Sequence, residues 1–216
     1  MIVRIICLFI GYAFGLFQTG YLYGKHHHFD IRNHGSGNSG ATNVLRTMGL
    51  KAGAITFLGD AFKCIFAVLL VKLLFKNTQA DILPLLALYA GFGAVLGHNY
   101  PFYMNFKGGK GIAVTAGIIA STDWRLTLVC LVIFVTVVAV TRYVSLGSLL
   151  ISLAFFIGVV LLGQAGEFGM AANHLMEMYI VAFLFVVSAF IRHRANIGLL
   201  LHGTENKISF KKKEGK

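Results

Sequence analysis

Three short polar clusters hold most of the residues of this chain that could do chemistry. They run from His34 to Asn43, from Lys107 to Gly111 and from Arg192 to Asn196, and long apolar stretches separate them. Backbone N–H groups, small hydroxyls and cations are the groups with which proteins bind phosphate-like anions. Because they border apolar segments, the clusters predict a site that holds a phosphorylated molecule beside an acyl chain.

The first cluster is a glycine-rich loop whose backbone can turn sharply and aim several N–H groups at one point. Arg46 follows Asn43 by three residues, so a helix that begins near Ala41 or Thr42 places both on one face. Ser36 can then supply a hydroxyl, and Arg46 a bidentate fork, for phosphate oxygens. A flexible loop with an N-cap at Thr42 or Asn43 is the alternative.

The second cluster runs directly into the apolar residues that begin at Ile112. A glycine loop at a helix N-terminus presents free N–H groups and the positive end of the helix dipole to an anion, and Lys107 and Lys110 add charge. Lys110 is followed by Gly111 where a Walker loop requires Ser or Thr, so the pattern does not support ATP binding.

The third cluster contains His193, the best-placed imidazole of the chain, with Asn196 three residues further on. His193 is a candidate acid–base group, and a capping or lipid-facing cation is the alternative. Arg142 and Ser145 occupy a further short turn and are expected to line the same pocket. His26, His27 and His28 lack the ligand partners of a metal site, so we expect no metal and no cofactor.

The elements that position these clusters are predicted to be membrane helices. A chain of 216 residues with a mean hydropathy of +0.76 cannot bury its apolar surface in one soluble core. Apolar stretches long enough for helical spans cover 2–24, 53–75, 82–100, 111–123, 124–141, 144–162 and 174–191. We expect an all-α integral membrane protein with about seven transmembrane helices, of which the fourth is short.

Charge predicts the orientation of these helices. The segments 25–52, 101–110, 142–143 and 192–216 carry 14 of the 19 Lys and Arg residues. The positive-inside rule places them and the C-terminus in the cytoplasm, with the N-terminus outside. The charge bias therefore argues against binding of nucleic acid, and favours the fourth segment as a span over a re-entrant one.

The sequence predicts one membrane-embedded domain over 1–207, followed by a basic cytoplasmic tail over 208–216. Asp60 and Lys63 lie in an apolar segment with a spacing that lets them pair, and a buried structural pair is expected. The cysteines Cys7, Cys64 and Cys130 lie in apolar stretches without partners, and we expect free thiols.

The ordered motifs resemble the bacterial acyl-phosphate:glycerol-3-phosphate acyltransferases from Thr19 to Lys207. They are Gly-Ser-Gly-Asn-Ser-Gly-Ala-Thr-Asn-Val, Gly-His-Asn-Tyr-Pro with Lys-Gly-Gly-Lys-Gly, Thr-Arg-Tyr-Val-Ser, and His-Arg-x-Asn-Ile with Gly-Thr-Glu-Asn-Lys. The resemblance implies a seven-helix enzyme of the bacterial inner membrane with its active-site loops in the cytoplasm. It would transfer a fatty acyl group from acyl phosphate to the sn-1 hydroxyl of glycerol 3-phosphate and form lysophosphatidic acid.

Motif by motif, the candidate catalytic residues are Ser36, Arg46, Lys107, His193 and Asn196. The candidate substrate-binding residues are Gly37, Asn38, Asn43, Gly108, Gly109, Lys110, Gly111, Arg142 and Ser145. The resemblance gives Glu205 a role in integrity. Three departures stand out: Phe17-Gln18 replaces a Ser-Ile-Pro-like entry to Thr19, Ser39 replaces an aliphatic residue, and Ala195 replaces Glu.

An acyl phosphate is already activated, so the chemistry needs positioning and charge neutralisation more than a covalent nucleophile. Either His193 or a phosphate oxygen of the substrate takes the hydroxyl proton, and we favour the phosphate. The expected partners are acyl phosphate, glycerol 3-phosphate, membrane lipid and, as a further candidate, the soluble enzyme that makes acyl phosphate from acyl carrier protein. The competing hypothesis is a transporter or binding protein for a phosphorylated metabolite.

Overall fold

The structure is a computed structural model that describes residues 1–208, and the tail expected at 208–216 lies outside these residues except for Ile208. The described residues form ten α-helices joined by short loops and three 3-10 turns. The helices are α1 (Ile2–Gly15), α2 (Thr19–His26), α3 (Ala41–Met48), α4 (Leu50–Phe75), α5 (Leu83–Asn99), α6 (Ile112–Thr122), α7 (Trp124–Thr141), α8 (Val144–Gln164), α9 (Ala172–Arg192) and α10 (Arg194–Leu201). The 3-10 turns cover Ile31–Asn33, Ala80–Ile82 and Phe102–Met104.

Six helical segments in the described residues are long and apolar enough to cross a bilayer. They are Ile2–His26, Leu50–Phe75, Ala80–Met104, Trp124–Thr141, Val144–Gln164 and Ala172–Arg192. Helix α6, the expected fourth span, has only 11 residues and is about 17 Å long at 1.5 Å per residue. The all-helical membrane architecture is therefore confirmed, while α6 falls below the length of the other spans.

The first apolar segment was expected to be one helix over 2–24, and the structure divides it into α1 and α2. Gln18 leaves the helical region with φ −98° and ψ 87°, which interrupts the hydrogen-bond ladder. The Phe17 carbonyl freed by this break accepts a hydrogen bond from Lys63 of α4 instead. Burial of a polar break in hydrocarbon requires such a partner.

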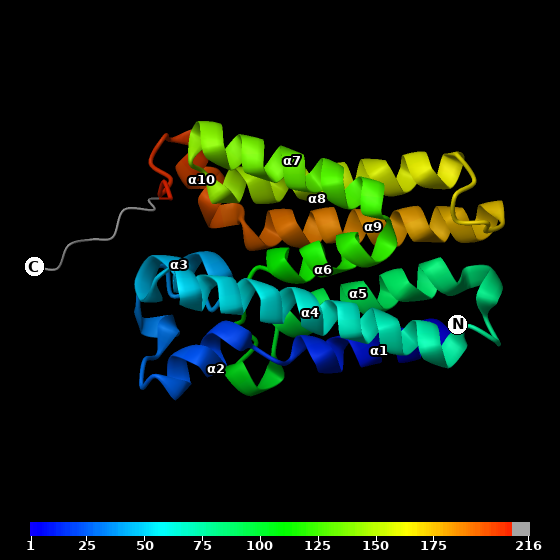
Figure 1. The fold of residues 1–216 in the computed structure, drawn as a ribbon, viewed down its shortest axis with the longest axis horizontal. Coiled ribbons are helices and arrows are strands. Elements are labelled where there is room, and N and C mark those ends of the chain that lie inside the picture. Colours follow the sequence, from blue (N-terminus) through cyan, green and yellow to red (C-terminus); the bar gives the residue numbers. More distant parts are fainter. Residues whose placement is uncertain (209–216) are drawn as a thin grey trace, which may run out of the picture.

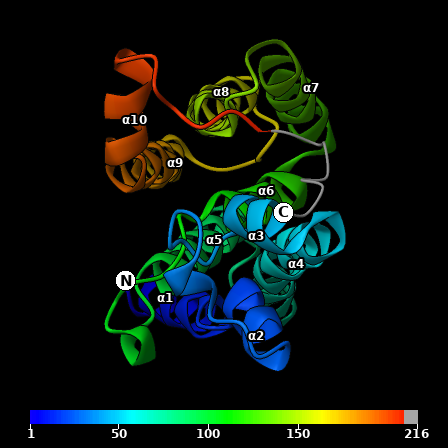
Figure 2. The same cartoon turned by 90° about the vertical axis from the view of Figure 1, so that its left-hand side faces the viewer.

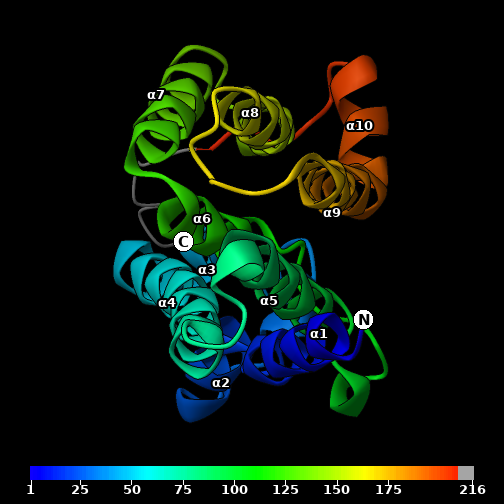
Figure 3. The ribbon, with the colours of Figure 1, turned by 90° about the vertical axis from the view of Figure 1, so that its right-hand side faces the viewer.

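The helices form two groups with α6 between them (Figure 1). Helices α1 to α5 form one group and α7 to α10 form the other, and both end-on views show the same division (Figures 2 and 3). The N-terminus and α10 lie at opposite ends of the molecule. The start of the chain and the third polar cluster therefore lie at opposite ends of the described helices.

Helices α1 and α5 pack backbone against backbone. Gly11 and Gly15 of α1 face Gly93 and Gly97 of α5, and a Cβ added at any of the four would overlap a backbone carbonyl of the other helix. Small residues spaced by four allow this close approach in membrane helices. The glycines of α1 thus make the helix–helix contact that their spacing predicts.

At the end away from α10, an ion pair joins the two groups of helices. Arg4 of α1 donates from Nε and Nη2 to the Glu177 carboxylate of α9, at 2.6 Å and 2.8 Å. Tyr89 of α5 donates to the same carboxylate at 2.8 Å. These contacts tie the two groups together at this end.

Candidate active site

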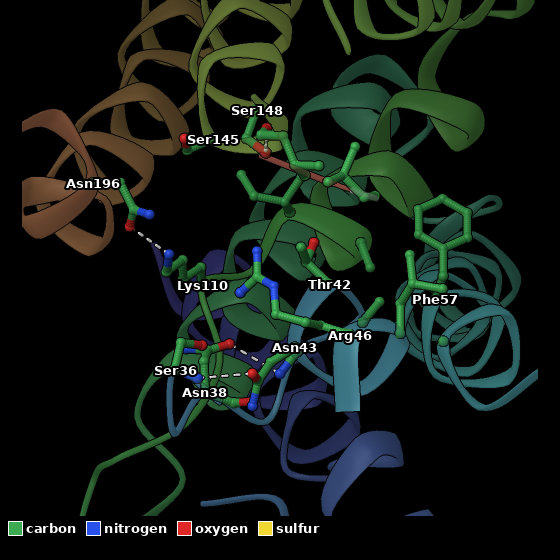
Figure 4. Close-up of a pocket in the computed structure, with 18 of the residues that line it drawn as sticks. Ser36, Asn38, Thr42, Asn43, Arg46, Phe57, Lys110, Ser145, Ser148 and Asn196 are labelled. Carbon is green, nitrogen blue, oxygen red and sulfur yellow. Dashed lines mark hydrogen bonds between the residues drawn. The ribbon is translucent and has the colours of Figure 1, made fainter. Parts of the chain in front are cut away.

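A cavity of about 600 Å³ lies between the two helix groups, at the end where α3, α4, α6 and α8 begin and α7 and α9 end. All three polar clusters contribute to its lining. Figure 4 shows Arg46, Lys110, Asn196 and Ser145 converging on this space from four different helices or loops. Helix ends are where backbone groups remain unpaired, so the cavity gathers polar groups without opening any helix.

Asn43 shapes the first loop from within. Its Oδ1 accepts the Ser36 backbone N–H at 2.9 Å, and its Nδ2 donates to the carbonyls of His34 at 3.0 Å and Asn38 at 2.9 Å. The side chain is buried and its polar atoms are engaged within the loop. Asn43, expected to bind substrate, holds the loop in shape and lines the cavity together with Ser36 and Asn38.

Helix α3 begins at Ala41, as the spacing predicts, but its N-cap is Gly40 rather than Thr42 or Asn43. No side chain of the described residues caps this end, so the first-turn N–H groups at Ala41 and Thr42 remain free beside the cavity. Arg46 lies one turn further along and lines the same cavity. Within residues 1–208, no hydrogen bond or ion pair engages its guanidinium, which leaves the fork available to an anion.

The glycine loop is fixed by backbone hydrogen bonds, although its glycines alone would allow it to be flexible. The N–H groups of Gly108 and Gly109 donate to the carbonyls of Asn99 and His98, both at 3.1 Å. These N–H groups are already paired within the protein and neither glycine lines the cavity, so the substrate-binding role of Gly108 and Gly109 stays a prediction. Gly111, in the left-handed region at φ 80°, does line it and starts α6 there.

The two lysines of this loop have different positions. Lys110 lines the cavity and is partly buried, whereas Lys107 is exposed outside it. Gly108 and Gly109, which lie between the two lysines in the chain, are held against the end of α5 by their hydrogen bonds to Asn99 and His98. Of the two lysines predicted for the site, the structure thus brings Lys110 to the cavity, and the role of Lys107 stays a prediction.

Lys110 belongs to a short polar chain that crosses between the helix groups. Its Nζ donates to Asn196 Oδ1 at 2.5 Å, and Asn196 Nδ2 donates to Glu205 Oε2 at 2.7 Å. Burial lowers the pKa of Lys110, opposed by the nearby Glu205 carboxylate, and Arg192 and Arg46 lower it further. Because Lys110 lies near other cations, binding of an anion there would relieve their mutual repulsion.

His193 lies at the junction of α9 and α10 and is buried against the cavity. Its Nδ1 lies 2.8 Å from the Ala189 carbonyl, which can only accept, so Nδ1 carries the proton and Nε2 is left as an acceptor. Burial, assisted by the Lys110 charge, lowers the pKa of His193 to about 4. The imidazole is therefore neutral at pH 7 and a weak base.

Helix α8 brings Ser145 to the cavity, while Arg142 lies outside it. The Ser145 hydroxyl is buried and has no hydrogen-bond partner within residues 1–208. Arg142 is exposed at φ 63°, and its carbonyl accepts the Ile208 N–H at 2.9 Å. Arg142 occupies the left-handed turn that ends α7, outside the lining, and its role in substrate binding stays a prediction. Gly37, in the turn closed by the His34 carbonyl, also lies outside the lining.

An apolar wall faces the cations. Leu50 and Phe57 of α4, Ile112 of α6, and Phe134 and Val138 of α7 line the side of the cavity toward α4 and α7. These helices expose large apolar side chains on their outer faces, as lipid contact requires. The cavity therefore combines an anion-binding side with an apolar side at the edge of the hydrophobic body.

Residues 5–203 match the family described as glycerol-3-phosphate acyltransferase. The chain belongs to the glycerol-3-phosphate acyltransferase family. A relative of that name in Clostridioides difficile (strain 630) is 41% identical over 213 residues, which cover 96% of this chain and 97% of the relative. One in Thermoanaerobacter sp. (strain X514) is 39% identical over 203 residues, 94% of each chain.

Two crystal structures share this fold. Both are of PlsY (YgiH), an integral membrane glycerol 3-phosphate acyltransferase. The glycerol 3-phosphate form matches with a TM-score of 0.81 at 30% identity and covers 95% of this chain and 96% of that one. The lysophosphatidic acid form matches with a TM-score of 0.79 at 29% identity and covers 96% of each. The resemblance found in the motifs is thereby confirmed at the level of family and fold.

Two of the positions at which this member of the family departs from the expected pattern contact each other. Ser39 Oγ donates to Gln18 Oε1 at 3.3 Å, and Gln18 Nε2 donates to the His98 carbonyl at 3.0 Å. Gln18 is fully buried and lies at the break between α1 and α2. The third departure, Ala195, lines the cavity and supplies no charge there.

Sequence reasoning did not assign several polar lining residues of this family member. Arg192 donates from Nε and Nη2 to the Gly109 carbonyl, at 3.0 Å and 2.7 Å, and from Nη2 to the Gly108 carbonyl at 2.9 Å. The sequence places Arg192 in the third polar cluster, but its contacts could not be predicted because its acceptors are backbone carbonyls of a distant loop. The unassigned polar lining residues are Thr42, His98, Ser148, Arg192 and Asn206.

Proposed function

We propose that this chain transfers a fatty acyl group from acyl phosphate to the sn-1 hydroxyl of glycerol 3-phosphate, forming lysophosphatidic acid and phosphate. The observation that carries the proposal is the cavity in which Arg46 and Lys110 face an apolar wall. Membership of the acyltransferase family supports it, as do the glycerol 3-phosphate and lysophosphatidic acid forms of the related PlsY. The polar and the apolar side of the cavity suit a molecule with a phosphate at one end and a fatty chain at the other.

The phosphate groups would bind where positive charge gathers. Arg46 offers a planar fork, Lys110 a point charge, and the first turns of α3 and α6 offer free N–H groups. The acyl chain would lie along Phe57 and the other apolar residues of α4 and α7. This arrangement brings the glycerol hydroxyl and the acyl carbonyl together by binding alone.

The acceptor oxygen attacks the acyl carbon, and the bond from that carbon to the phosphate oxygen breaks. Nε2 of neutral His193 accepts a hydrogen bond from the attacking hydroxyl and orients it. A pKa of about 4 makes His193 a poorer base than a phosphate group, whose second pKa is near ~6. The proton therefore passes to a phosphate oxygen of the substrate, and phosphate leaves.

The donor is proposed to be acyl phosphate because the cavity supports positioning rather than covalent catalysis. The buried thiols of Cys7, Cys64 and Cys130 are not among the residues that line it. Nδ1 of His193 donates a hydrogen bond to a backbone carbonyl, so the imidazole is not paired with a carboxylate as it is in a Ser-His-Asp triad. An already activated mixed anhydride suits such a site.

The cavity end is proposed to face the cytoplasm of a bacterial inner membrane, because the positively charged loops gather there. A soluble acyl-phosphate-forming enzyme could then deliver the donor from that side. A transporter would instead place its anion site near the middle of the bilayer on broken helices. The cavity lies at the helix ends, which favours the enzyme.

The donor assay tests the proposal. Purified protein in lipid receives palmitoyl phosphate with and without glycerol 3-phosphate, or palmitoyl-CoA in place of the acyl phosphate. We expect phosphate release and lysophosphatidic acid only with acyl phosphate and glycerol 3-phosphate together. Equal product from palmitoyl-CoA would contradict the donor assignment. Uptake of glycerol 3-phosphate into proteoliposomes without any donor would favour the transporter.

A further inference from the structure

A buried cluster of charged and polar groups lies beneath the glycine loop, and its members are Asp60 and Lys63 of α4 and His98 of α5. All three are at most 5% exposed. Charged residues inside a membrane helix bundle are costly, so they persist where they have a specific task. A simple structural pair accounts for Asp60 and Lys63 but leaves His98 unexplained.

Lys63 uses all three of its protons within the protein. Its ammonium donates to the Asp60 carboxylate at 2.8 Å, to His98 Nδ1 at 2.9 Å and to the Phe17 carbonyl at 2.5 Å. An ammonium has three donors and no acceptor, so Nδ1 of His98 must be the unprotonated nitrogen. One cation thus joins α4, the end of α5 and the break between α1 and α2.

His98 carries this link to the glycine loop. Its ring lies directly under Gly109, where an added Cβ would overlap the imidazole, and its carbonyl accepts the Gly109 N–H at 3.1 Å. The same carbonyl accepts from Gln18. Gly109 immediately precedes Lys110, so a shift of the His98 ring would move the lysine that lines the cavity.

The cluster is not arranged for stability alone. Asp60 Oδ1 accepts from Thr19 and Lys63, whereas Asp60 Oδ2 is buried without a hydrogen-bond partner in the described part of the chain. A buried pair that served only to stabilise the fold would gain by satisfying every oxygen or by apolar replacement. The energetic cost of this unpaired oxygen indicates that the cluster is retained because it fixes the geometry of the residues around it.

We propose that Asp60, Lys63 and His98 act as a positioning unit that fixes the glycine loop, and with it Lys110 and the start of α6, for binding the phosphate of glycerol 3-phosphate. The inference rests on the proposed function for the identity of the ligand, while the link to the loop rests on the contacts alone. Lys63 is a positioning residue because it touches the loop only through His98, whereas Asp60 and His98 also line the cavity.

The test combines a double substitution with a matched control. Asp60→Asn with Lys63→Gln removes both charges together and so avoids leaving one buried charge unpaired. The shorter glutamine side chain cannot span the three acceptors. Lys72→Met is the control, because Lys72 lies in the same helix and donates to the distant Ser121 carbonyl. Lys63→Arg serves as a second variant that retains the positive charge if the double variant fails to fold.

Two readouts separate positioning from stability. Hydrogen exchange of the peptide over 105–112 should accelerate in the double variant and in Lys63→Arg, because the Gly108 and Gly109 N–H groups lose their fixed acceptors. In those variants KM for glycerol 3-phosphate should rise by at least about tenfold while KM for palmitoyl phosphate changes by less than about threefold. The Lys72→Met variant should match the wild type in both.

Unchanged exchange and an unchanged KM for glycerol 3-phosphate in a folded variant would overturn the positioning role. An equal rise in both KM values would also overturn it, since that pattern indicates general damage. If the wild-type protein does not acylate glycerol 3-phosphate at all, the proposed function fails, and the exchange result still decides whether the unit holds the loop.

Discussion

At the scale of single residues, the proposed path of the proton depends on the state of His193. Its Nδ1 is committed to the Ala189 carbonyl and its Nε2 is the free acceptor. A neutral imidazole in that state can orient a hydroxyl, but it is too weak a base to take the proton of that hydroxyl. The proposed mechanism therefore assigns the role of base to a phosphate oxygen of the substrate.

The lowered pKa of His193 predicts a pH dependence of stability. The folded value is about 4 because of burial, and an exposed imidazole titrates near ~6.5, so the unfolded state binds more protons between these values. Stability contributed by the neutral group is full above that window and falls as the pH falls through it. The apparent melting temperature of wild type should therefore drop more than that of His193→Gln between about pH 7 and pH 4.5. Equal drops would show that the imidazole is not held neutral.

Variants of Glu205 can distinguish a structural role of this residue from a role in the chemistry. Its Oε2 accepts from Asn196 and its Oε1 from the Asn206 N–H, and the bond from Asn196 survives if an amide oxygen takes the place of Oε2. Glu205→Gln should keep turnover within about threefold, whereas Glu205→Ala should lower stability by roughly 1–3 kcal/mol by leaving the Asn196 amide unpaired. Thermal unfolding and turnover of the two variants check this, and loss of activity in a stable Glu205→Gln would assign the charge to the chemistry.

Gln18 and Ser39 predict an energetic coupling between two positions that depart from the family pattern. Their hydrogen bond is buried and joins the α1–α2 break to the first loop. Single alanine variants and the double variant form a cycle, whose coupling should be about 0.5–1.5 kcal/mol in favour of the pair. Additive losses would mean that the two residues act independently.

At the scale of elements, the apolar spans could be predicted because hydrophobic length alone fixes where a bilayer helix lies. The bounds of α4, α7 and α8 agree closely with expectation. The break between α1 and α2 could not be predicted, because it depends on Lys63 of α4 donating a hydrogen bond to the Phe17 carbonyl. Likewise Lys107 and Lys110 share a loop and a charge, and only the folded structure shows that Lys110 lines the cavity while Lys107 is exposed.

Glycine packing between α1 and α5 gives a prediction at this scale. An alanine methyl at Gly11 would overlap the Ala90 carbonyl, so Gly11→Ala should cost about 1–3 kcal/mol. Gly198→Ala in α10 is the control, since nothing lies within 4 Å of its added Cβ. Melting curves of both variants check this, and an unchanged Gly11→Ala would mean that the helices separate without cost.

At the scale of the whole molecule, the two helix groups are tied by Arg4 and Glu177 at one end and by Lys110 and Asn196 at the other. The cavity occupies the second end, where every polar cluster meets. The sequence could predict that the three clusters lie near one another. It could not predict the contacts that join the two groups of helices, such as that of Arg192 with the glycine loop, because these depend on the tertiary structure.

The measurement that tests the account most directly compares the two lysines of that loop. Lysophosphatidic acid formed from palmitoyl phosphate and labelled glycerol 3-phosphate is measured in lipid for wild type, Lys110→Ala and Lys107→Ala. Lys110 lines the cavity and Lys107 does not, so we predict that kcat/KM falls by at least about 100-fold for Lys110→Ala and less than about threefold for Lys107→Ala. Equal losses, or a greater loss for Lys107→Ala, would contradict the assignment of acyl transfer to this cavity.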